Sequence, residues 1–557
     1  MKLKLIICSA AVGMLAVSCF DDKYDLDDID TTSRIEVKDL VVPVNFSDVL
    51  LSDIMHLKDD SDIKVIENDG STFYAVSRTG TFTSKKINIK QPEADATGLE
   101  QKTSVLSENN GSYALQPLDN EFTFECDDVD KSIVTINSVK IADLDFSFVF
   151  YAQNVRSGKY ENVRLQLPKA MTGSASAGTY DASNGVWTIP SLSINSDGEA
   201  SAVFTANSID FSKNEGFAYE NPVFTFTSHF GLLDGSLLAS AGSTVNFTAD
   251  FRIGHLIATA VTGEIKYELE GMVFDPINFD DLPKFLQGEG TDISLVNPLI
   301  CLQTTNPVAA DNLKYSANLK ITPMRGVTAS APLTSSTFTV DYDKGNKAKY
   351  NTVLSPERPD YVPADYEGYL WFVYNNLGNI LAGDGMPSAL NIDVENPEIP
   401  RQPVNNFSLG EDIDGVVGSY EFFAPLALKD GSTIYYSDTK DGWNKDIEYM
   451  TIRSLSISAK AVNNIPLEAT VSMIPIDLDG NEVQNITIIP VELAAGTAEQ
   501  DVKFVVKANS EEGFSNLDGV RFKATVLSTD EETLSPDLTI VLKDVRATID
   551  GYYEKEL

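Results

Sequence analysis

The chain has 557 residues, of which 43% are apolar and 22% charged, and its formal net charge is −40. This length and apolar content exclude a disordered chain and leave room for roughly three or four domains. The acidic excess argues against a nucleic-acid partner, because phosphate binding needs clustered lysine and arginine side chains. It suits an extracellular domain that must stay soluble.

The first 18 residues have the pattern of an export signal. Lys2 and Lys4 precede a largely apolar run, Leu5–Val17, and Ser18 is small. The run is shorter than the roughly 20 apolar residues that a membrane span needs, so we expect residues 1–18 to be cleaved as a signal peptide. Cys19 follows directly. An ordinary secretory signal followed by a chance cysteine is the alternative.

The residues Ala16-Val17-Ser18 before a lone cysteine resemble a bacterial lipobox, in which the cysteine is acylated and becomes the first residue of the mature chain. The usual lipobox leucine stands three residues before the cysteine, whereas Ala16 stands there in this chain. The resemblance implies that Cys19 carries a diacylglycerol and palmitate-type anchor, which makes the membrane a partner through that lipid.

An acidic tether, residues 19–32, follows the leader. Its carboxylates would avoid an anionic lipid surface, so we expect it to be solvated. They are Asp21, Asp22, Asp25, Asp27, Asp28 and Asp30. In Bacteroidota-type lipoproteins a similar cluster accompanies export to the outer face of the outer membrane. That resemblance implies display on the cell exterior.

Alternation of apolar and polar residues with a period of two dominates the rest of the chain. Examples are "DLDFSFVFYAQNV", "NPVFTFTSHF" and "QDVKFVVKA". Between such runs lie turn signals such as "NDGS" at 68–71 and "SDGE" at 196–199. Many short strands joined by tight turns predict an all-β chain of tandem antiparallel β-sandwich domains, immunoglobulin-like or related.

Helical signals are confined to two short stretches. In residues 45–57, Ser47 can cap a helix that would place Val49, Leu50 and Ile54 on one face. Residues 278–287 predict a short helix or a single turn. We expect both to be connectors packed on sheets.

Proline-rich stretches indicate the domain boundaries. In "NPEIPRQPV" at 396–404, Pro397, Pro400 and Pro403 recur every third residue and would stiffen a linker towards polyproline II. A weaker boundary lies near residue 255. After the tether we therefore expect an N-terminal β region (33–255) with room for two sandwiches, a middle β domain (256–396), a linker (397–404) and a C-terminal β-sandwich domain (405–557).

No catalytic motif is evident in the sequence. The three histidines are widely separated, and there is no H-E-x-x-H, P-loop or G-x-S-x-G pattern. We therefore expect no enzymatic activity and no cofactor other than calcium, although a glycosidase-like carboxylate pair is compatible with the 82 acidic residues. Cys126 and Cys301 remain after processing, either as buried free thiols or as one long-range disulfide.

Aromatic residues in polar loops are the best binding candidates, because sugar rings stack on aromatic faces while amides and carboxylates bind the hydroxyls. Trp443 and Asn444 lie in the turn-rich loop "KDGWNKD". Tyr361 and Tyr366 precede a run, 369–374, that is apolar on both faces and predicts a central buried strand. We expect both tyrosines to be exposed, and the tryptophans at 187 and 371 to be core residues.

The same C-terminal loop is rich in carboxylates. Asp438, Asp441 and Asp446 are oxygen ligands of the kind that calcium prefers. The spacing does not resemble an EF-hand. A solvated surface loop is the alternative to a calcium site.

The segments "CFDDKYDLDDIDTT" and "NNIPLEATVSMIPIDLDGNE" resemble large Bacteroidota outer-membrane lipoproteins of unassigned function. The resemblance implies no catalytic residues. We expect a surface-anchored, non-enzymatic lipoprotein that binds an extracellular ligand, with a glycan as the leading candidate. The alternatives are a structural, adhesion or assembly component that binds a surface protein and, more weakly, a carboxylate-pair glycosidase.

Overall fold

The computed structural model describes residues 32–43, 49–55, 57, 61–279, 286, 290–305, 313–342, 349–442, 444, 449–531 and 533–556. Strands account for 64% of the residues and helices for 3%, in several antiparallel sheets, so the predicted all-β class is confirmed. The signal peptide, Cys19 and the tether as far as residue 31 lie outside the described residues. No helix among the described residues is long and apolar enough to cross a membrane.

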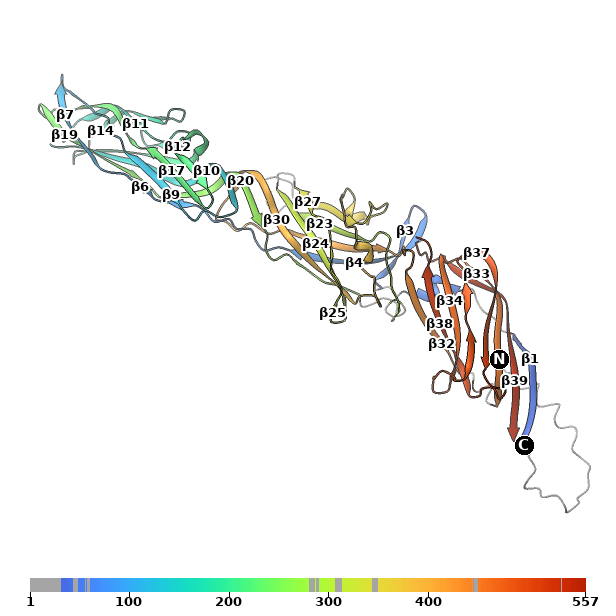
Figure 1. Ribbon diagram of the computed structural model, residues 1–557. Coiled ribbons are helices and arrows are strands. Elements are labelled where there is room, and N and C mark those ends of the chain that lie inside the picture. Colours follow the sequence, from blue (N-terminus) through green and yellow to red (C-terminus); the bar gives the residue numbers. More distant parts are fainter. Residues whose placement is uncertain are drawn as a thin grey trace, which may run out of the picture.

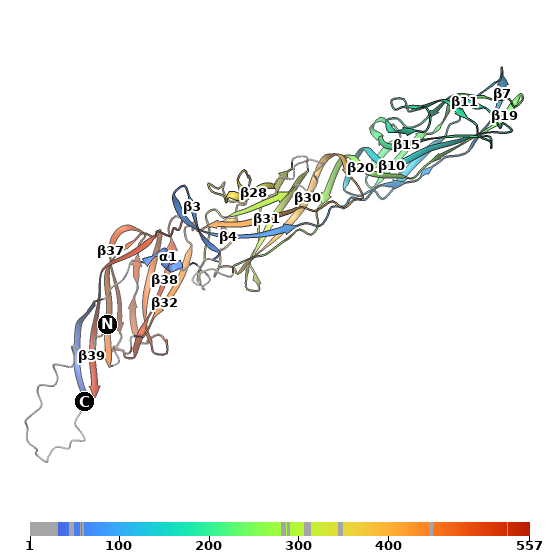
Figure 2. The same ribbon diagram turned by 180° about the vertical axis from the view of Figure 1, so that it is seen from behind.

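The molecule is a long rod with three consecutive regions, called here the base, the middle region and the distal region (Figures 1 and 2). The chain starts in the base, runs through the middle region to the distal region, and returns. Strand β1 (Thr32–Pro43) pairs antiparallel with β39 (Thr539–Glu556), so the first and last described strands are neighbours in the base. The distal region therefore lies at the end of the rod opposite both chain ends.

The base is a sandwich of two antiparallel sheets, with strand orders β1-β39-β33-β37-β35 and β32-β38-β34-β36. Apolar side chains from both sheets fill the space between them. Its further elements are β2 (Val49–Leu50), α1 (Leu51–Met55), β32 (Thr433–Lys440), β33 (Met450–Asn463), β34 (Leu467–Asp477), β35 (Ile486–Ile489), β36 (Val491–Leu493), β37 (Gly496–Ala508) and β38 (Leu517–Ser528).

The middle region packs a sheet of order β21-β4-β31-β23-β28-β29, extended by β3, against strands grouped around β24 and β30. The pair β28–β29 is parallel. The bounds are β3 (Ile63–Asn68), β4 (Ser71–Thr83), β21 (Val273–Phe274), β22 (Ile277–Asn278), β23 (Leu299–Thr305), β24 (Lys314–Arg325), β25 (Thr328–Ala329), β26 (Leu333–Thr334), β27 (Phe338–Asp341), β28 (Lys349–Ser355), β29 (Leu370–Val373), β30 (Ala389–Ser408) and β31 (Val417–Pro425).

The distal region is built around β10 (Ile133–Ala152), on which Phe146, Phe148 and Phe150 are buried at alternate positions. Trp187 is fully buried, as predicted, and its Nε1–H donates to the Ala177 carbonyl at 2.8 Å. The other strands are β5 (Glu93–Ala94), β6 (Ala96–Thr97), β7 (Lys102–Asn109), β8 (Ser112–Ala114), β9 (Glu121–Cys126), β11 (Lys159–Gln166), β12 (Met171–Ala175), β13 (Thr179–Asp181), β14 (Val186–Ser193), β15 (Glu199–Asp210), β16 (Phe217–Glu220), β17 (Val223–His229), β18 (Gly231–Leu238), β19 (Thr244–Ile253) and β20 (Leu256–Glu268).

The predicted linker at 397–404 is wrong, because these residues lie inside the 20-residue strand β30, which pairs with β20. Two features let prolines enter this strand. The register of β30 with β20 shifts next to Pro400, and the pairing of β30 with β24 ends at Glu398. Beyond Glu398 the strand therefore needs fewer backbone N–H donors, which proline lacks. The boundary between the middle and C-terminal domains near 396–405 is therefore wrong as well.

The regions are also not consecutive in sequence, contrary to the predicted division at residue 255. The segment expected to form one N-terminal region supplies β1 and α1 to the base, and β3 and β4 to the middle region. The largest cluster of buried apolar side chains includes Leu51 of the base and Phe247 of the distal region. A continuous core of this kind makes the rod one packed body.

Turns were predicted from the sequence more accurately than domain boundaries. In "NDGS", Asp69 and Gly70 have φ values of 47° and 83° and close the β3–β4 hairpin between Asn68 and Ser71. A two-residue turn of this kind needs positive φ at both central residues, which aspartate tolerates and glycine favours. Of the two predicted helices, the first appears as the single turn α1; most of 278–287 lies outside the described residues.

Candidate functional site

The predicted loop site around Trp443 is only partly visible. Trp443 and Asp446 lie outside the described residues, as does the side chain of Asp438, while Asp441 is exposed. The backbone N–H of Asn444 donates to Asp518 Oδ1 at 3.2 Å, and that of Gly442 to Asp518 Oδ2 at 3.3 Å. Asp518, which the sequence reasoning missed, thus fixes the described part of this loop through main-chain groups.

A metal ion elsewhere in the described part of the chain would need several ligand side chains that converge. No group of three or more His, Cys, Asp or Glu side chains there converges as metal ligands would. Cys126 and Cys301 are both buried and free, so the thiol alternative holds for this pair.

A hollow of about 390 Å³ lies between the middle region and the base. Tyr361, one of the predicted aromatic residues, lines it together with Phe73, whose ring meets the tyrosine edge-on at 5.7 Å between centroids. Both rings are half-buried. The remaining lining residues are Ser71, Thr72, Val296, Asn297, Leu299, Pro359, Asp360, Pro425, Ala427 and Thr533.

The loop at 356–369, which carries Tyr361, is pinned to the outer face of the middle sheet by amide side chains. Asn297 exchanges two hydrogen bonds of 3.1 Å with the backbone of Glu357. Gln303 and Asn351 each donate to the Asp365 carbonyl at 3.2 Å. Because three amide side chains hold the loop in place, it forms a fixed wall of the hollow.

Tyr366 is buried, contrary to the prediction that it would be exposed. A short 3-10 turn, Ala364–Tyr366, directs its side chain into a small core on the outer face of the sheet, where it packs with Cys301 and Phe423. The sequence could not show this, because the loop itself covers these apolar residues. Tyr366 therefore holds the loop in place and does not face the hollow.

The strand that follows the loop also differs from its prediction. The run around Trp371 forms the four-residue edge strand β29, not a central buried strand. The indole is half-buried and its Nε1–H donates to Ser355 Oγ at 2.9 Å. The apolar run covers the edge of the sheet instead of filling its centre.

A buried carboxylate lies beneath the same loop. Glu421 is 9% exposed, sits opposite Cys301 in the β23–β31 ladder, and accepts a hydrogen bond of 2.8 Å from Ser77 Oγ. Burial raises the pKa of Glu421, and the hydrogen bond from Ser77 only partly opposes that effect. Burial, reinforced by Glu421, also raises the pKa of Tyr361, so its phenol stays protonated at neutral pH.

Several polar groups face the hollow. Among the described residues no hydrogen bond or ion pair engages the side chains of Ser71, Thr72, Asp360 or Thr533. Aromatic edges, hydroxyls and one carboxylate around a concave surface can bind a polyhydroxylated ligand. Asp360 is the single carboxylate among the lining residues that the structure describes, whereas glycosidases use two.

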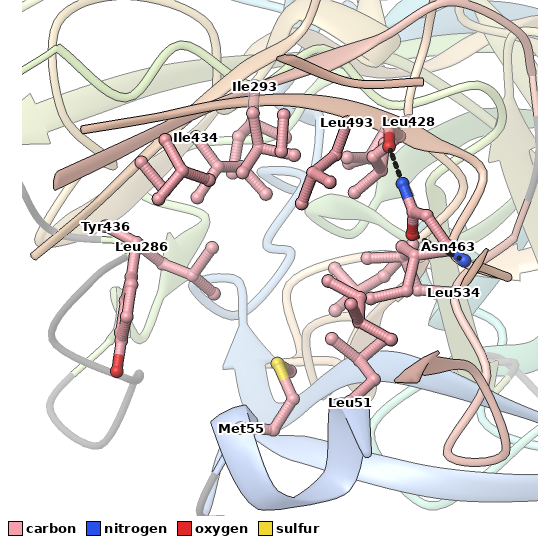
Figure 3. Close-up of a pocket in the computed structure, with 18 of the residues that line it drawn as sticks. Leu51, Met55, Leu286, Ile293, Leu428, Ile434, Tyr436, Asn463, Leu493 and Leu534 are labelled. Atoms are coloured by element: carbon pink, nitrogen blue, oxygen red, sulfur yellow. Dashed lines mark hydrogen bonds between the residues drawn. The ribbon is translucent and has the colours of Figure 1, made fainter. Parts of the chain in front are cut away.

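A second cavity, of about 300 Å³, lies inside the base and is lined almost entirely by aliphatic side chains (Figure 3). It backs onto the hollow, because Pro425 and Ala427 face the hollow while Leu426 and Leu428 face the cavity. At about 24 cal/mol per Å³, an empty void of this size would cost roughly 7 kcal/mol relative to a packed core.

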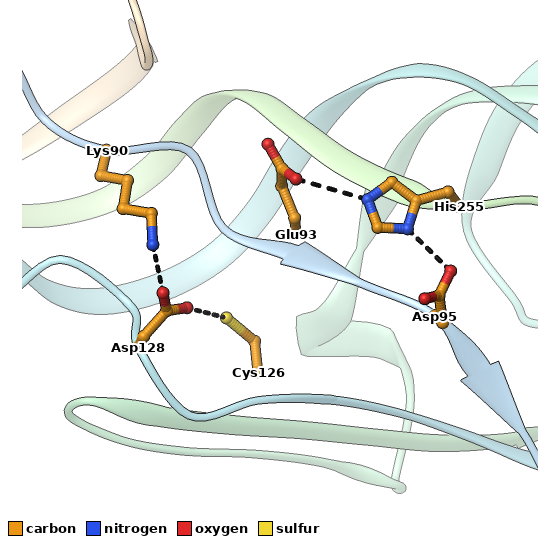
Figure 4. A network of polar contacts seen from close by, with 6 residues as sticks. All are labelled: Lys90, Glu93, Asp95, Cys126, Asp128 and His255. Atoms are coloured by element: carbon orange, nitrogen blue, oxygen red, sulfur yellow. Dashed lines mark hydrogen bonds and ion pairs between the residues drawn. The ribbon is translucent and has the colours of Figure 1, made fainter.

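A polar cluster lies on the surface where β20 pairs with β5, and Figure 4 shows its six side chains. His255 contacts Asp95 at 2.8 Å through Nδ1 and Glu93 at 3.4 Å through Nε2, and the bond to Asp95 is the main reason that its pKa is raised. Beside it, Lys90 pairs with Asp128, which also accepts from the Cys126 thiol. Within this cluster His255, Lys90 and the Cys126 thiol each contact a carboxylate.

Comparisons with known proteins identify no family. No family model matches the chain, and no curated protein matches it. Among solved structures, a chain described as a secreted protein of Parabacteroides distasonis is similar over 53% of this chain and 90% of its own, with 13% identity and a TM-score of 0.38.

Proposed function

We propose that this protein is a non-enzymatic lipoprotein of the outer membrane, facing the cell exterior, which binds a glycan in the hollow beside Tyr361. The observation that carries the proposal is the hollow itself. It combines two half-buried aromatic rings with unpaired hydroxyls and one exposed carboxylate. Such a surface offers stacking for the apolar face of a sugar and hydrogen bonds for its hydroxyls.

The direction of the rod agrees with an anchor on Cys19. The first described strand, β1, lies in the base, and the distal region lies at the opposite end (Figure 1). A lipid on Cys19 would hold the base near the membrane, with the hollow above it and the distal region further out. The lipobox resemblance and the acidic tether support this placement.

The test is retention of the mature chain, with Cys19→Ala to remove the anchor, by a panel of plant, host and microbial polysaccharides in affinity electrophoresis. Asp360→Ala and Tyr361→Phe should each weaken binding to the retained polysaccharide by about tenfold, which corresponds to about 1.4 kcal/mol for one lost hydrogen bond. Tyr151→Phe, at a tyrosine that is 40% exposed in the distal region, is the matched control.

Two outcomes would contradict the glycan proposal. One is the absence of retention by every polysaccharide in the panel. The other is retention that neither the change at Asp360 nor the change at Tyr361 weakens. A retained polysaccharide whose binding depends on Trp443 instead would move the site to the C-terminal loop.

An adhesion or assembly role is the second candidate, and one observation favours it. Within the described residues β1 pairs with β39 alone, so its other side is a sheet edge, and Ile35, Leu40 and Val41 on this strand are 49%, 42% and 51% exposed. A partner strand can add to such an edge. If Val41→Lys abolishes attachment to a surface protein while glycan binding persists, the edge is a separate interface.

A further inference from the structure

Among the described residues that line it, the aliphatic cavity in the base offers a ligand almost only apolar contacts. Its one amide side chain, Asn463, is fully engaged: Nδ2 donates to the carbonyls of Leu467 at 2.9 Å and Ala494 at 3.3 Å, and Oδ1 accepts from the Ile465 N–H at 3.1 Å. In Figure 3 the Tyr436 hydroxyl points away from the centre of the cavity. A buried polar group of a ligand would therefore find no partner and would lose its hydration.

The cavity exists because small side chains occupy adjacent positions in one sheet of the base. Ala469 pairs with Val526 and Val471 with Ala524 in the β34–β38 ladder, and all four line the cavity. Larger residues at these adjacent positions would fill the space, as protein interiors normally do. The helix α1 adds Leu51 and Met55 to the lining, and Figure 3 shows them below the other labelled side chains.

We propose that this cavity binds the aliphatic chain of a single-chain amphiphile such as a free fatty acid. A volume of about 300 Å³ holds about ten groups of the size of a water molecule, or of a methylene, at about 30 Å³ each. Engineered apolar cavities half as large already take up small apolar ligands. The charged head would stay in the solvent near Tyr436.

A free amphiphile fits better than the lipid on Cys19 of the same chain. Thr32 pairs with Glu556, whereas Ile540 lines the cavity, so the two points are separated by 16 strand residues or roughly 50 Å. The 13 residues from Cys19 to Thr32 span at most about 45 Å. Only a fully extended tether lying along β1 and β39 would bring the lipid on Cys19 to the cavity, and such ordering costs chain entropy that a free amphiphile does not lose.

Binding of dodecanoate to the mature chain with Cys19→Ala, followed by displacement of a dansyl-labelled fatty acid, tests the proposal. Ala524→Phe should weaken binding at least tenfold by filling the cavity and should keep or raise the melting temperature of the unliganded protein. Thr525→Phe is the matched control, because Thr525 is the next residue on β38, is exposed, and faces the opposite side of the sheet.

Saturable dodecanoate binding that Ala524→Phe removes and Thr525→Phe leaves unchanged would support the site. No dodecanoate binding to the parent chain, or equal binding by a folded Ala524→Phe variant, would overturn it. If Ala524→Phe does not fold, Ala469→Leu gives the same comparison with a smaller change. Stronger binding by the acylated protein's own lipid, seen as loss of dodecanoate uptake when Cys19 is intact, would overturn the assignment to a free amphiphile. Glycan binding at the hollow is measured separately, so either proposal can fail alone.

Discussion

Truncation of Tyr366 should destabilise the loop at 356–369, which forms one wall of the hollow. Its ring is 4% exposed and packs in the small core with Cys301 and Phe423, so Tyr366→Ala leaves a cavity under the loop. Removing a buried aromatic ring typically costs 3–5 kcal/mol, and the position of this ring under a loop that can partly collapse favours about 3 kcal/mol. Tyr361→Phe, which retains the half-buried ring, should cost less than about 1 kcal/mol.

Urea unfolding followed by circular dichroism gives the two free energies, and hydrogen exchange locates the effect. Tyr366→Ala should raise exchange throughout residues 356–369 and weaken glycan binding indirectly, because Asp360 and Tyr361 lose their fixed positions. Tyr361→Phe should leave exchange unchanged. A loss of under about 1 kcal/mol for Tyr366→Ala, with normal protection of the loop, would refute the buried placement of this side chain.

Three further predictions concern other parts of the molecule. Burial raises the pKa of Glu421, so the stability contributed by its protonated form is present at low pH and is lost as the pH rises through that raised pKa. The melting temperature of Glu421→Gln should therefore rise relative to that of the parent between pH 4 and pH 8. A difference in melting temperature that shrinks with rising pH would contradict this prediction. Trypsin should spare the bond after Arg401, since β30 pairs with β20 there, and an early fragment ending at Arg401 would restore the linker interpretation. Cys19→Ala should move the protein from the membrane fraction to the soluble fraction, and retention in the membrane would exclude the lipid anchor.

Local features of this fold could be predicted well from the sequence. The alternation in "DLDFSFVFYAQNV" correctly gave the buried face of β10, and the Asp69-Gly70 pair gave a hairpin turn. Both depend on residues close together in the chain. Trp187, which follows a hairpin turn, was also predicted correctly as a core residue, and it lies on the buried face of β14.

Long-range pairing could not be predicted in the same way. The pairing of β1 with β39 joins residues about 500 positions apart, and no local sequence pattern near Thr32 predicts this partner. Pro397, Pro400 and Pro403 suggested a linker because the register shifts that accommodate them in β30 depend on β20, more than 100 residues earlier. The hollow was missed for the same reason: Phe73, Asp360 and Thr533 come together only in the folded rod. Tyr361, which lines the hollow, was singled out because aromatic residues in polar loops are a local signal, but it is half-buried and not exposed as expected.

Hydrogen exchange of the mature chain with and without the retained polysaccharide tests the central claim most directly. Binding at the hollow predicts new protection in residues 71–73 and 356–361, with little change in the distal region. Protection confined to the distal loops or to the loop around Asn444, with none near Tyr361, would contradict the proposed site.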